Sequence, residues 1–377
     1  MIRILNIVNN LDGGATEAWL ARVCEMARML RPDWEWTFYC TYAQRGKLDE
    51  YVRGLGARIV DSPYRVGNKM AFFLSLRSFL KENPHDILHC HHDFMSAVYL
   101  WASLGVPLRK RIVHIHNTDE EIPTSSWWKK RVLHEPMRQT CLHRADNIIG
   151  VSHHALSKFL NGTLRDSKRD RVLYCGIETA LFEKKPGNLG HFRQSLGLPN
   201  DAKILLFVGR MVSIKNPIFA LKILEIAVKW DSTIVLCFVG TGVLETELNA
   251  FIKQAGLAKH VRMLGWRDDV AQVMKASNLF VFPRIEEPKE ALGLVLVEAQ
   301  AAGLPMLVSK GVPSDAIVVP RLLNILPLAD GPESWARQAI KILSMPKPDQ
   351  LTSLAEVANS PFSMHNSAAA LIDLYES

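Results

Sequence analysis

The sequence alternates short apolar runs with longer segments of helical length. The first four runs are IRILNIV (residues 2–8), DILHC (86–90), RIVHIH (111–116) and NIIGVS (147–152). The segments that follow them are 16–30, 93–104, about 125–144 and 153–160. Because parallel strands must be joined by crossovers, which are usually helices, this alternation predicts a parallel sheet with helices on both faces. We therefore expect an α/β, doubly wound fold.

The same alternation starts again after a segment rich in glycine, proline and charged residues, EKKPGNLGHFRQSLGLPNDA (183–202). It continues with KILLFVG (203–209), TIVLCFVG (233–240), HVRMLG (260–265) and NLFVFP (278–283). A chain of 377 residues also exceeds the usual size of a single core. We expect two Rossmann-like domains that face a central cleft, residues 1–182 and 183–360, with a C-terminal helix in 361–377 that crosses back to the first domain.

Composition indicates a folded cytoplasmic protein. Hydrophobic residues make up 48% and charged residues 22%, as in ordinary globular chains. The first apolar run ends at Asn9, too early for an export signal, and no apolar stretch is long enough to cross a bilayer. The six cysteines show no C-x-x-C spacing, so we expect reduced thiols in the core.

The positive charge is concentrated in the first half of the chain. Residues 1–180 contain 25 Lys and Arg against 19 Asp and Glu, whereas the remainder contains 20 against 19. No nucleic-acid-binding motif accompanies this charge, so we expect an anionic membrane surface or a lipid-linked phosphate as partner. The segment from Trp127 to Arg131 (WWKKR) suits a lipid headgroup zone, although an ordinary amphipathic helix also explains it.

Glycines follow two of the predicted strands, where doubly wound sheets bind their ligands. Gly13 and Gly14 follow the first run, and Gly240 and Gly242 follow TIVLCFV. Backbone without a Cβ lets a phosphate or sugar approach closely, and a helix N-terminus attracts anions. A structural turn explains each pair equally well, so neither pair decides the function by itself.

Two cations occupy one loop of the second domain. Arg210 directly follows the predicted strand KILLFVG, and Lys215 comes five positions later. Arginine offers a fixed fork and lysine a mobile point charge, a combination that suits a diphosphate. The alternative is two solvated surface cations.

Two glutamates stand in the apolar stretch EALGLVLVEAQAAGLP (290–305). On one helix, Glu290 and Glu298 would lie about 12 Å apart, too far to share a metal ion but suited to the two ends of an extended ligand. Between them, Gly293, Leu294 and Val295 begin an apolar helix whose first N–H groups suit a diphosphate. This layout matches a nucleoside diphosphate sugar. The alternative for Glu298 is a helix cap or a salt bridge.

These motifs together resemble those of the retaining glycosyltransferases of family four, which have the GT-B fold and include bacterial lipopolysaccharide and exopolysaccharide transferases. The shared features are GR followed by a lysine, then GTG, then the E-x7-E spacing with AQAAGLP after it. Two segments depart from the family pattern: Ala291 and Leu292 replace the usual Gly and Phe, and Cys175 to Glu178 replaces the usual Asn-Gly-Ile-Asp turn.

The resemblance implies roles for individual residues. It places Arg210 and Lys215 on the donor diphosphate, Glu290 on the transferred sugar and Glu298 on the ribose. The segment GWRDDV matches the part that encloses the base, which implicates Arg267 and Val270. The segment VHIHNTD matches the acceptor side of the first domain, which places His116 near the reacting carbon.

The sequence gives no support for a metal ion or a cofactor. In HCHHDF (89–94), adjacent strand residues point to opposite faces, so we do not expect these side chains to converge on a metal. No D-x-D pair occurs in the chain. Cationic side chains and helix dipoles are therefore expected to neutralise the leaving group in place of a metal ion.

The resulting hypothesis is a retaining, metal-independent hexosyltransferase that uses a nucleotide sugar, most simply a UDP-sugar. Its acceptor would be a glycan or a lipid-linked molecule of bacterial polysaccharide or glycoconjugate synthesis, reached at the inner face of the membrane. Two alternatives remain open: a nucleotide-sugar epimerase of the same fold, and a catalytically silent subunit that binds nucleotide.

Overall fold

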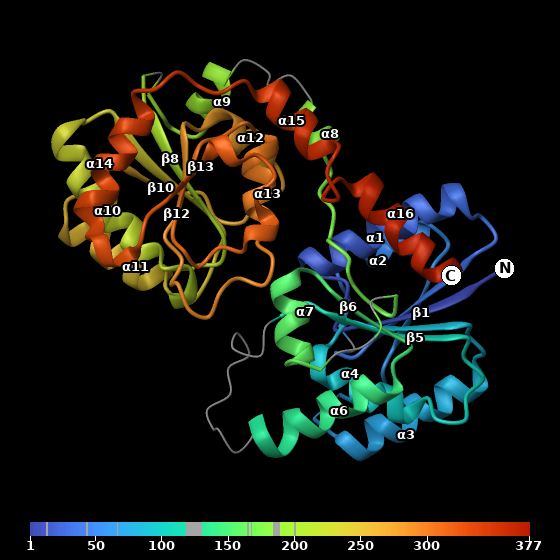
Figure 1. Cartoon of the computed structure of the whole chain (residues 1–377). Coiled ribbons are helices and arrows are strands. Elements are labelled where there is room, and N and C mark those ends of the chain that lie inside the picture. Colours follow the sequence, from blue (N-terminus) through green and yellow to red (C-terminus); the bar gives the residue numbers. More distant parts are fainter. Residues whose placement is uncertain are drawn as a thin grey trace. The chain divides into compact units, whose positions relative to one another are not determined.

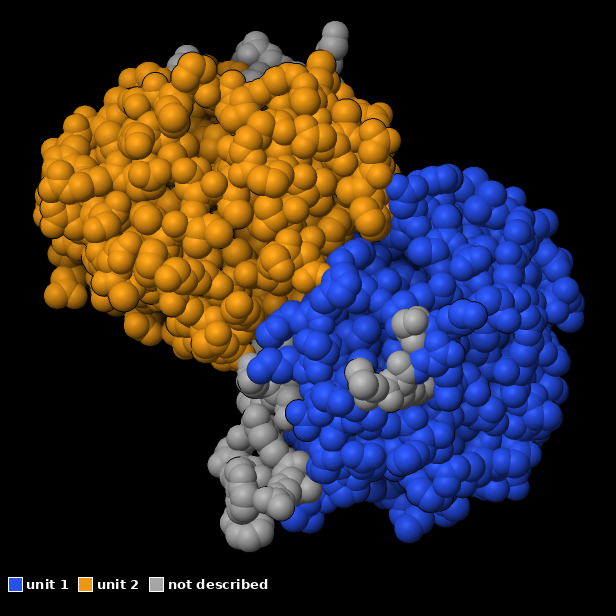
Figure 2. Space-filling view, viewed as in Figure 1, with its two compact units in different colours: residues 1–176, 364–377 blue, residues 177–363 orange. Residues whose placement is uncertain are grey.

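The computed structural model describes the whole chain except residues 13, 43, 66, 118–129, 164–165, 167, 184–188 and 200. The chain divides into unit 1, Met1–Gly176 with Met364–Ser377, and unit 2, Ile177–Ser363 (Figure 2). The division comes earlier than the seam expected at residue 182. Its physical reason is that Ile177 already pairs with the returning segment of unit 2, because its N–H donates to the carbonyl of Phe362 at 2.8 Å.

Unit 1 contains a sheet in which seven described strands run parallel. Their order is β3 (Arg58–Asp61), β2 (Glu35–Cys40), β1 (Arg3–Val8), β4 (Ile87–Cys90), β5 (Lys110–Ile115), β6 (Asn147–Gly150) and β7 (Asp170–Val172). The direction of winding reverses between β1 and β4. Such a reversal is the topological switch point, where the loops at the carboxyl ends diverge and leave room for ligands.

Helices cover both faces of this sheet (Figure 1). On one face lie α1 (Ala15–Leu30), α2 (Asp49–Gly54) and α16 (Met364–Glu376), and on the other lie α3 (Lys69–Glu82), α4 (Ser96–Ala102) and α6 (Glu135–Arg144). A further helix, α7 (His153–Leu160), follows β6. The last helix of the chain is fixed in unit 1 because the indole N–H of Trp19 donates to Ser367 Oγ at 2.8 Å.

Unit 2 repeats this architecture with six described parallel strands. Their order is β10 (Val261–Met263), β9 (Ile234–Val239), β8 (Lys203–Val208), β11 (Leu279–Phe282), β12 (Met306–Val308) and β13 (Leu323–Ile325). Here the switch point lies between β8 and β11. The α/β, doubly wound prediction is therefore confirmed for both units.

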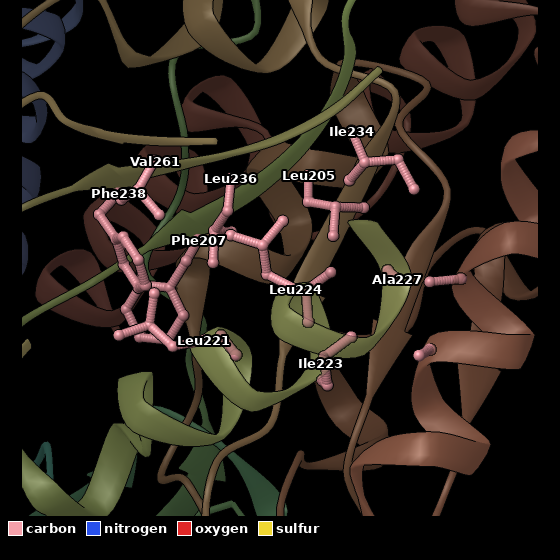
Figure 3. Packing of buried hydrophobic residues seen from close by; sticks show 14 of the residues in the cluster. Leu205, Phe207, Leu221, Ile223, Leu224, Ala227, Ile234, Leu236, Phe238 and Val261 are labelled. Atoms are coloured by element: carbon pink, nitrogen blue, oxygen red, sulfur yellow. The ribbon is translucent and has the colours of Figure 1, made fainter. Parts of the chain in front are cut away.

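The core of unit 2 shows why its strands read as continuous apolar runs. One face of the sheet packs against α10 (Pro217–Trp230), α11 (Glu245–Gln254) and α14 (Gly331–Leu343). The other face is covered by α12 (Val270–Ala276) and α13 (Leu294–Ala301). A further helix, α15 (Gln350–Ala358), packs against α13. Figure 3 shows Phe207 and Phe238 from adjacent strands meeting Leu221 of α10. Full burial of such a side chain contributes about 1.5 to 3 kcal/mol.

Other sequence expectations can be compared with the described residues. All six cysteines are buried and none forms a disulfide. In the described part of the chain, no helix combines the length and hydrophobicity needed to cross a bilayer. Of the helix expected over about 125–144, the α-helical part begins at Glu135, and residues 118–129 lie outside the described ranges.

Candidate functional site

Three loops meet at the switch point of unit 2. They follow β8, β11 and β12, and hydrogen bonds between their backbones fix them together. Ile285 N–H donates to the carbonyl of Ile214 at 3.1 Å, and Glu290 N–H donates to the carbonyl of Gly311 at 2.9 Å. The hydroxyl of Ser309 donates to the carbonyl of Arg284 at 2.5 Å. These bonds give the polar side chains of the loops a fixed backbone.

A carboxylate between two cations forms the centre of this region. Lys215 Nζ lies 2.6 Å from Oε1 and 2.5 Å from Oε2 of Glu290. Arg284 Nε donates to Oε2 of the same carboxylate at 2.6 Å. The Lys215 ammonium also lies 5.1 Å from the centre of the Phe282 ring, within the range of a cation–π contact. The three charged groups together carry a net charge of +1.

The three charged side chains, Glu290 and its two cationic partners, are largely buried. The Arg284 side chain has no exposed surface, and Lys215 and Glu290 keep 12% and 15%. Desolvation opposes ionisation of Glu290, but attraction to Lys215 and Arg284 outweighs it and holds the pKa of Glu290 below its ordinary value. Removing one partner of such a group leaves a buried charge uncompensated, which typically costs about 3 to 5 kcal/mol.

Arg284 was not among the residues predicted from the sequence. Its guanidinium also donates to the carbonyls of Ile285 and Pro288, so it organises the segment that leads to Glu290. The available signal was its position: Arg284 directly follows NLFVFP, at the carboxyl end of a strand beside the switch point. What it binds becomes clear only from the folded chain.

The structure separates the two cations that the sequence paired. Arg210 lies in the loop after β8 and is exposed, and within the described residues its guanidinium makes no hydrogen bond or ion pair. Lys215, by contrast, is bound to Glu290. Arg210 is therefore available to an incoming anion, whereas Lys215 has to be shared between that anion and Glu290.

Glu298 differs from Glu290 in both position and charge state. It lies on α13, whereas Glu290 precedes that helix, so the single-helix geometry considered for the pair does not occur. Some of its side chain reaches solvent, yet protein atoms surround the carboxyl closely enough that desolvation raises its pKa to about 7. No described residue forms a hydrogen bond or ion pair with this carboxyl, so the cap or salt bridge considered for Glu298 is not seen.

The start of α13 requires a glycine. Gly293 caps the helix in the left-handed region at φ 73°, and a Cβ there would lie 3.2 Å from Cγ of Glu290. The first helical residues are Leu294 and Val295, and N–H groups of a first turn lack partners within the helix. The backbone therefore presents N–H groups close to Glu290.

Gly240 and Gly242 have a structural reason of their own. A Cβ at Gly240 would lie 2.2 Å from the carbonyl oxygen of Gly209, and one at Gly242 would lie 2.4 Å from that of Met211. The loops after β8 and β9 thus pack backbone against backbone. A ligand contact at these glycines stays a prediction.

The segment predicted to enclose a base has a defined geometry. Arg267 forms two hydrogen bonds with Asp269, Nε to Oδ1 and an Nη to Oδ2, both at 2.6 Å. Val270 is the first residue of α12. The planar, paired guanidinium is a rigid surface of the kind that stacks on rings.

Gly14 and His116 belong to unit 1. Gly14 directly precedes α1. Thr16 lies in the first turn of this helix, and its hydroxyl is 3.1 Å from Nδ1 of His116. The backbone N–H of His116 donates to Oδ1 of Asp93 at 2.7 Å. Desolvation lowers the pKa of His116 to about 3, so its imidazole is neutral at physiological pH.

Two family models match the chain, one in each half. "Glycosyltransferase Family 4" matches residues 21–181, and "Glycosyl transferases group 1" matches residues 190–356. The chain belongs to glycosyltransferase family four. Among relatives, the putative glycosyltransferase EpsF of Bacillus subtilis is 26% identical over 99% of this chain and 96% of its own length. A UDP-Gal:α-D-GlcNAc-diphosphoundecaprenol α-1,3-galactosyltransferase of Escherichia coli is 28% identical over 70% of this chain and 67% of its own length.

Solved structures share the fold of this transferase. Alr3699/HepE of Anabaena, in complex with UDP and glucose, superposes with a TM-score of 0.78 at 18% identity over the full length of both chains. WaaG, a glycosyltransferase of lipopolysaccharide biosynthesis, superposes with a TM-score of 0.68 at 16% identity over 99% and 96%. The two parallel-sheet units of the transferase thus form the GT-B fold.

One interpretation of the sequence needs correction. The adjacent residues Cys90 and His91 do point to opposite sides, but His89 of β4 and His91, which directly follows β4, are two positions apart and share a face. With His114 of β5 they bring ligand nitrogens within 4.8 Å of one another. The histidines of the transferase therefore converge, which the argument from adjacent residues did not foresee.

The predicted membrane-contacting segment cannot be placed. Trp127, Trp128 and Lys129 lie outside the described residues, and only the backbone of Lys130 and Arg131 is described, at the start of a π-helical turn, Lys130–His134.

Proposed function

We propose that this transferase moves a hexose from a UDP-sugar to a glycan or lipid-linked acceptor, with retention of the anomeric configuration. The observation that carries the proposal is the group formed by Lys215, Glu290 and Arg284 at the switch point of unit 2. Retention and the UDP-sugar donor follow the family pattern. The UDP complexes of Alr3699/HepE and the UDP-Gal donor of the E. coli relative support this donor.

The charges of the site suit a departing nucleoside diphosphate. As the glycosidic bond breaks, negative charge builds on the diphosphate, and groups already oriented toward that charge stabilise the transition state most. We assign this work to Arg210, Lys215 and the N–H groups at the start of α13. The cationic excess of the group makes a bridging metal ion unnecessary in this mechanism.

The state of the two carboxylates favours attack from the same face as the leaving group. A double displacement needs a free carboxylate nucleophile. Glu290 is held by two cations, which lowers its nucleophilicity, and desolvation raises the pKa of Glu298 to about 7, which favours its protonated form. In our mechanism Glu290 therefore orients the transferred sugar, Glu298 holds the ribose diol, and the departing phosphate takes the proton of the acceptor hydroxyl.

The acceptor and the cellular role rest on relatives. The Staphylococcus aureus relative CapH is a capsular polysaccharide biosynthesis glycosyltransferase, and the E. coli relative acts on a diphosphoundecaprenol-linked sugar. We infer a role in bacterial polysaccharide or glycoconjugate synthesis, in the cytoplasm and at the inner face of the membrane. The excess of basic residues in 1–180 suits a lipid-linked phosphate.

A panel of UDP-sugars without acceptor tests the proposal against its alternatives. A transferase hydrolyses its donor slowly, an epimerase converts it to a stereoisomer, and a silent subunit changes nothing. We expect slow hydrolysis of one UDP-hexose and none of the matched GDP- or ADP-sugar. Isomerisation of the UDP-sugar, or turnover of only another nucleotide, would contradict the assignment.

A further inference from the structure

Three histidines converge inside unit 1, next to His116, whose Nε2 lies 3.0 Å from Nδ1 of His91. His89 comes from β4, His91 directly follows that strand, and His114 comes from β5. The ring centres of His89 and His91 are 4.0 Å apart, and each lies 5.4 Å from that of His114. His89 and His114 have no exposed surface and His91 keeps 6%. We call these three residues the histidine cluster.

Strand register explains why the cluster shares one face. Asn6 of β1 pairs with His89, and His89 pairs with Ile112 of β5. Paired residues of parallel strands point the same way and the side-chain period is two, so His91 and His114 join that row. Helices α1 and α16 cover this face through Trp19, whose ring lies 5.5 Å from that of His114, and through Tyr375.

The hydrogen bonds of the cluster are incomplete. Nε2 of His89 and both ring nitrogens of His114 have no hydrogen-bond partner within the described residues. A backbone group of Leu173 acts to raise the pKa of His114, but neither ring nitrogen of His114 has a hydrogen bond of normal geometry. A buried polar atom without a partner costs about 1 to 3 kcal/mol, so native proteins fill such sites with a bound ion or water.

The protonation state of the imidazole rings suits coordination of a metal ion, which accepts lone pairs from the ring nitrogens. The Tyr375 hydroxyl lies 2.6 Å from Nδ1 of His89. When that nitrogen carries the proton, Nε2 directs its lone pair into the cluster, the second-shell arrangement typical of metal-binding histidines. Burial, with repulsion between neighbouring rings, lowers the pKa of all three well below the ordinary value, so the imidazoles are neutral.

We propose that His89, His91 and His114 bind one zinc ion in the interior of unit 1. Three neutral imidazoles form an established zinc-binding set that leaves a fourth position for water or hydroxide. A hydroxide in the fourth position would offset part of the charge of the ion.

Binding requires a small adjustment. With Zn–N bonds of about 2.0 to 2.1 Å in a tetrahedron, ligand nitrogens lie about 3.4 Å apart, closer than the 4.8 Å limit within which these nitrogens fall. In the proposed complex the rings have to rotate to close this difference. His91 has to give up one of its two contacts, with Asn6 Oδ1 at 3.2 Å or with His116 Nε2 at 3.0 Å.

The test is the metal content of the full-length chain, purified without a polyhistidine tag. We expect close to one zinc per chain by inductively coupled plasma mass spectrometry, and background levels in His114→Asn and His89→Gln. His365→Gln is the matched control, because His365 is an exposed histidine of α16 in the same unit, and it should keep the zinc. Zinc retained in a folded His114→Asn variant would overturn the assignment.

A second measurement on the unaltered chain covers variants that fail to fold. After unfolding with chelator, refolding with added Zn²⁺ should restore one equivalent and raise Tm, because an ion that binds only the folded state stabilises it. X-ray absorption at the zinc edge should show imidazole nitrogens around the ion. A chain that takes up no zinc on refolding, or zinc surrounded only by oxygen, would overturn the proposal.

Discussion

The Nε of Arg284, a side chain with no exposed surface, donates to Oε2 of Glu290 at 2.6 Å. This bond fixes one side of a carboxylate whose other side faces Lys215. The glutamate is thereby ionised and oriented before a substrate arrives, so it pays no reorganisation cost when the reaction begins.

Arg284→Met should destabilise unit 2 by about 3 kcal/mol, because it removes one of two charges from a buried carboxylate. Urea unfolding measures this loss. Arg337→Met is the matched control, since Arg337 is 69% exposed and pairs with Glu333 on the surface; it should cost about 1 kcal/mol or less. Equal losses in the two variants would show that the Arg284 bond has no special role.

Glu298 should make stability depend on pH. Its pKa rises from 4.5 to about 7 on folding, so below pH 4.5 the carboxyl is protonated in both states and costs nothing. As the pH rises through this window, only the unfolded chain releases the proton, and wild-type stability falls by at most about 3 kcal/mol. The free energy of unfolding of Glu298→Gln should therefore rise relative to that of the wild type between pH 4.5 and 7. Above pH 7 the difference between the two should stay constant. Parallel stability curves would contradict the raised pKa.

Transfer should not need Mg²⁺ or Mn²⁺, because cationic side chains supply the charge at the diphosphate. Initial rates in excess EDTA should match those with added divalent ions. The zinc proposed in unit 1 is buried and would exchange slowly, so it does not interfere with this comparison. Loss of turnover in EDTA followed by recovery with Mg²⁺ or Mn²⁺ would show that a metal bridges the diphosphate.

Binding to anionic vesicles should weaken as salt rises, since exposed charges are screened beyond about 8 Å at physiological ionic strength. Replacing Lys129, Lys130 and Arg131 together by Ser should release the transferase in a sedimentation assay. The matched control replaces the same charge in unit 2, at the exposed Lys229, Lys253 and Lys259. If both triple variants bind alike, the basic segment does not contact the membrane.

The fold was predictable from the sequence where strands are buried on both faces. Such strands read as continuous apolar runs, as in β8 and β9, and their alternation with helices gives the topology. Several short strands were not predicted. β3 (RIVD), β7 (DRV) and β13 (LNI) lie at sheet edges and are only partly buried, whereas β12 (MLV) is buried but is only three residues long. β2 (EWTFYC) was also missed, although its aromatic residues resemble a strand.

The site was predictable only in part. A strand end identified Arg210 and Lys215, and the apolar stretch around it identified Glu290. The ion pairs that join Lys215 and Arg284 to Glu290 were not predictable, because they link loops from different strands. To predict the histidine cluster, one also has to know the strand order β1, β4, β5, because this order decides which side chains become neighbours. Sequence spacing contains no record of that order.

The most direct test of the account compares Glu290→Gln with Glu298→Gln in steady-state kinetics at pH 8, where Glu298 is ionised. If Glu290 acts on the sugar as charge develops, its variant should mainly lower kcat. If Glu298 holds the ribose equally in ground and transition states, its variant should mainly raise the donor KM. Each effect should be about ten- to a hundredfold, the loss of one charged hydrogen bond. Circular dichroism confirms folding; folded variants with near-normal constants and changed thermal stability would show that the two carboxylates are structural.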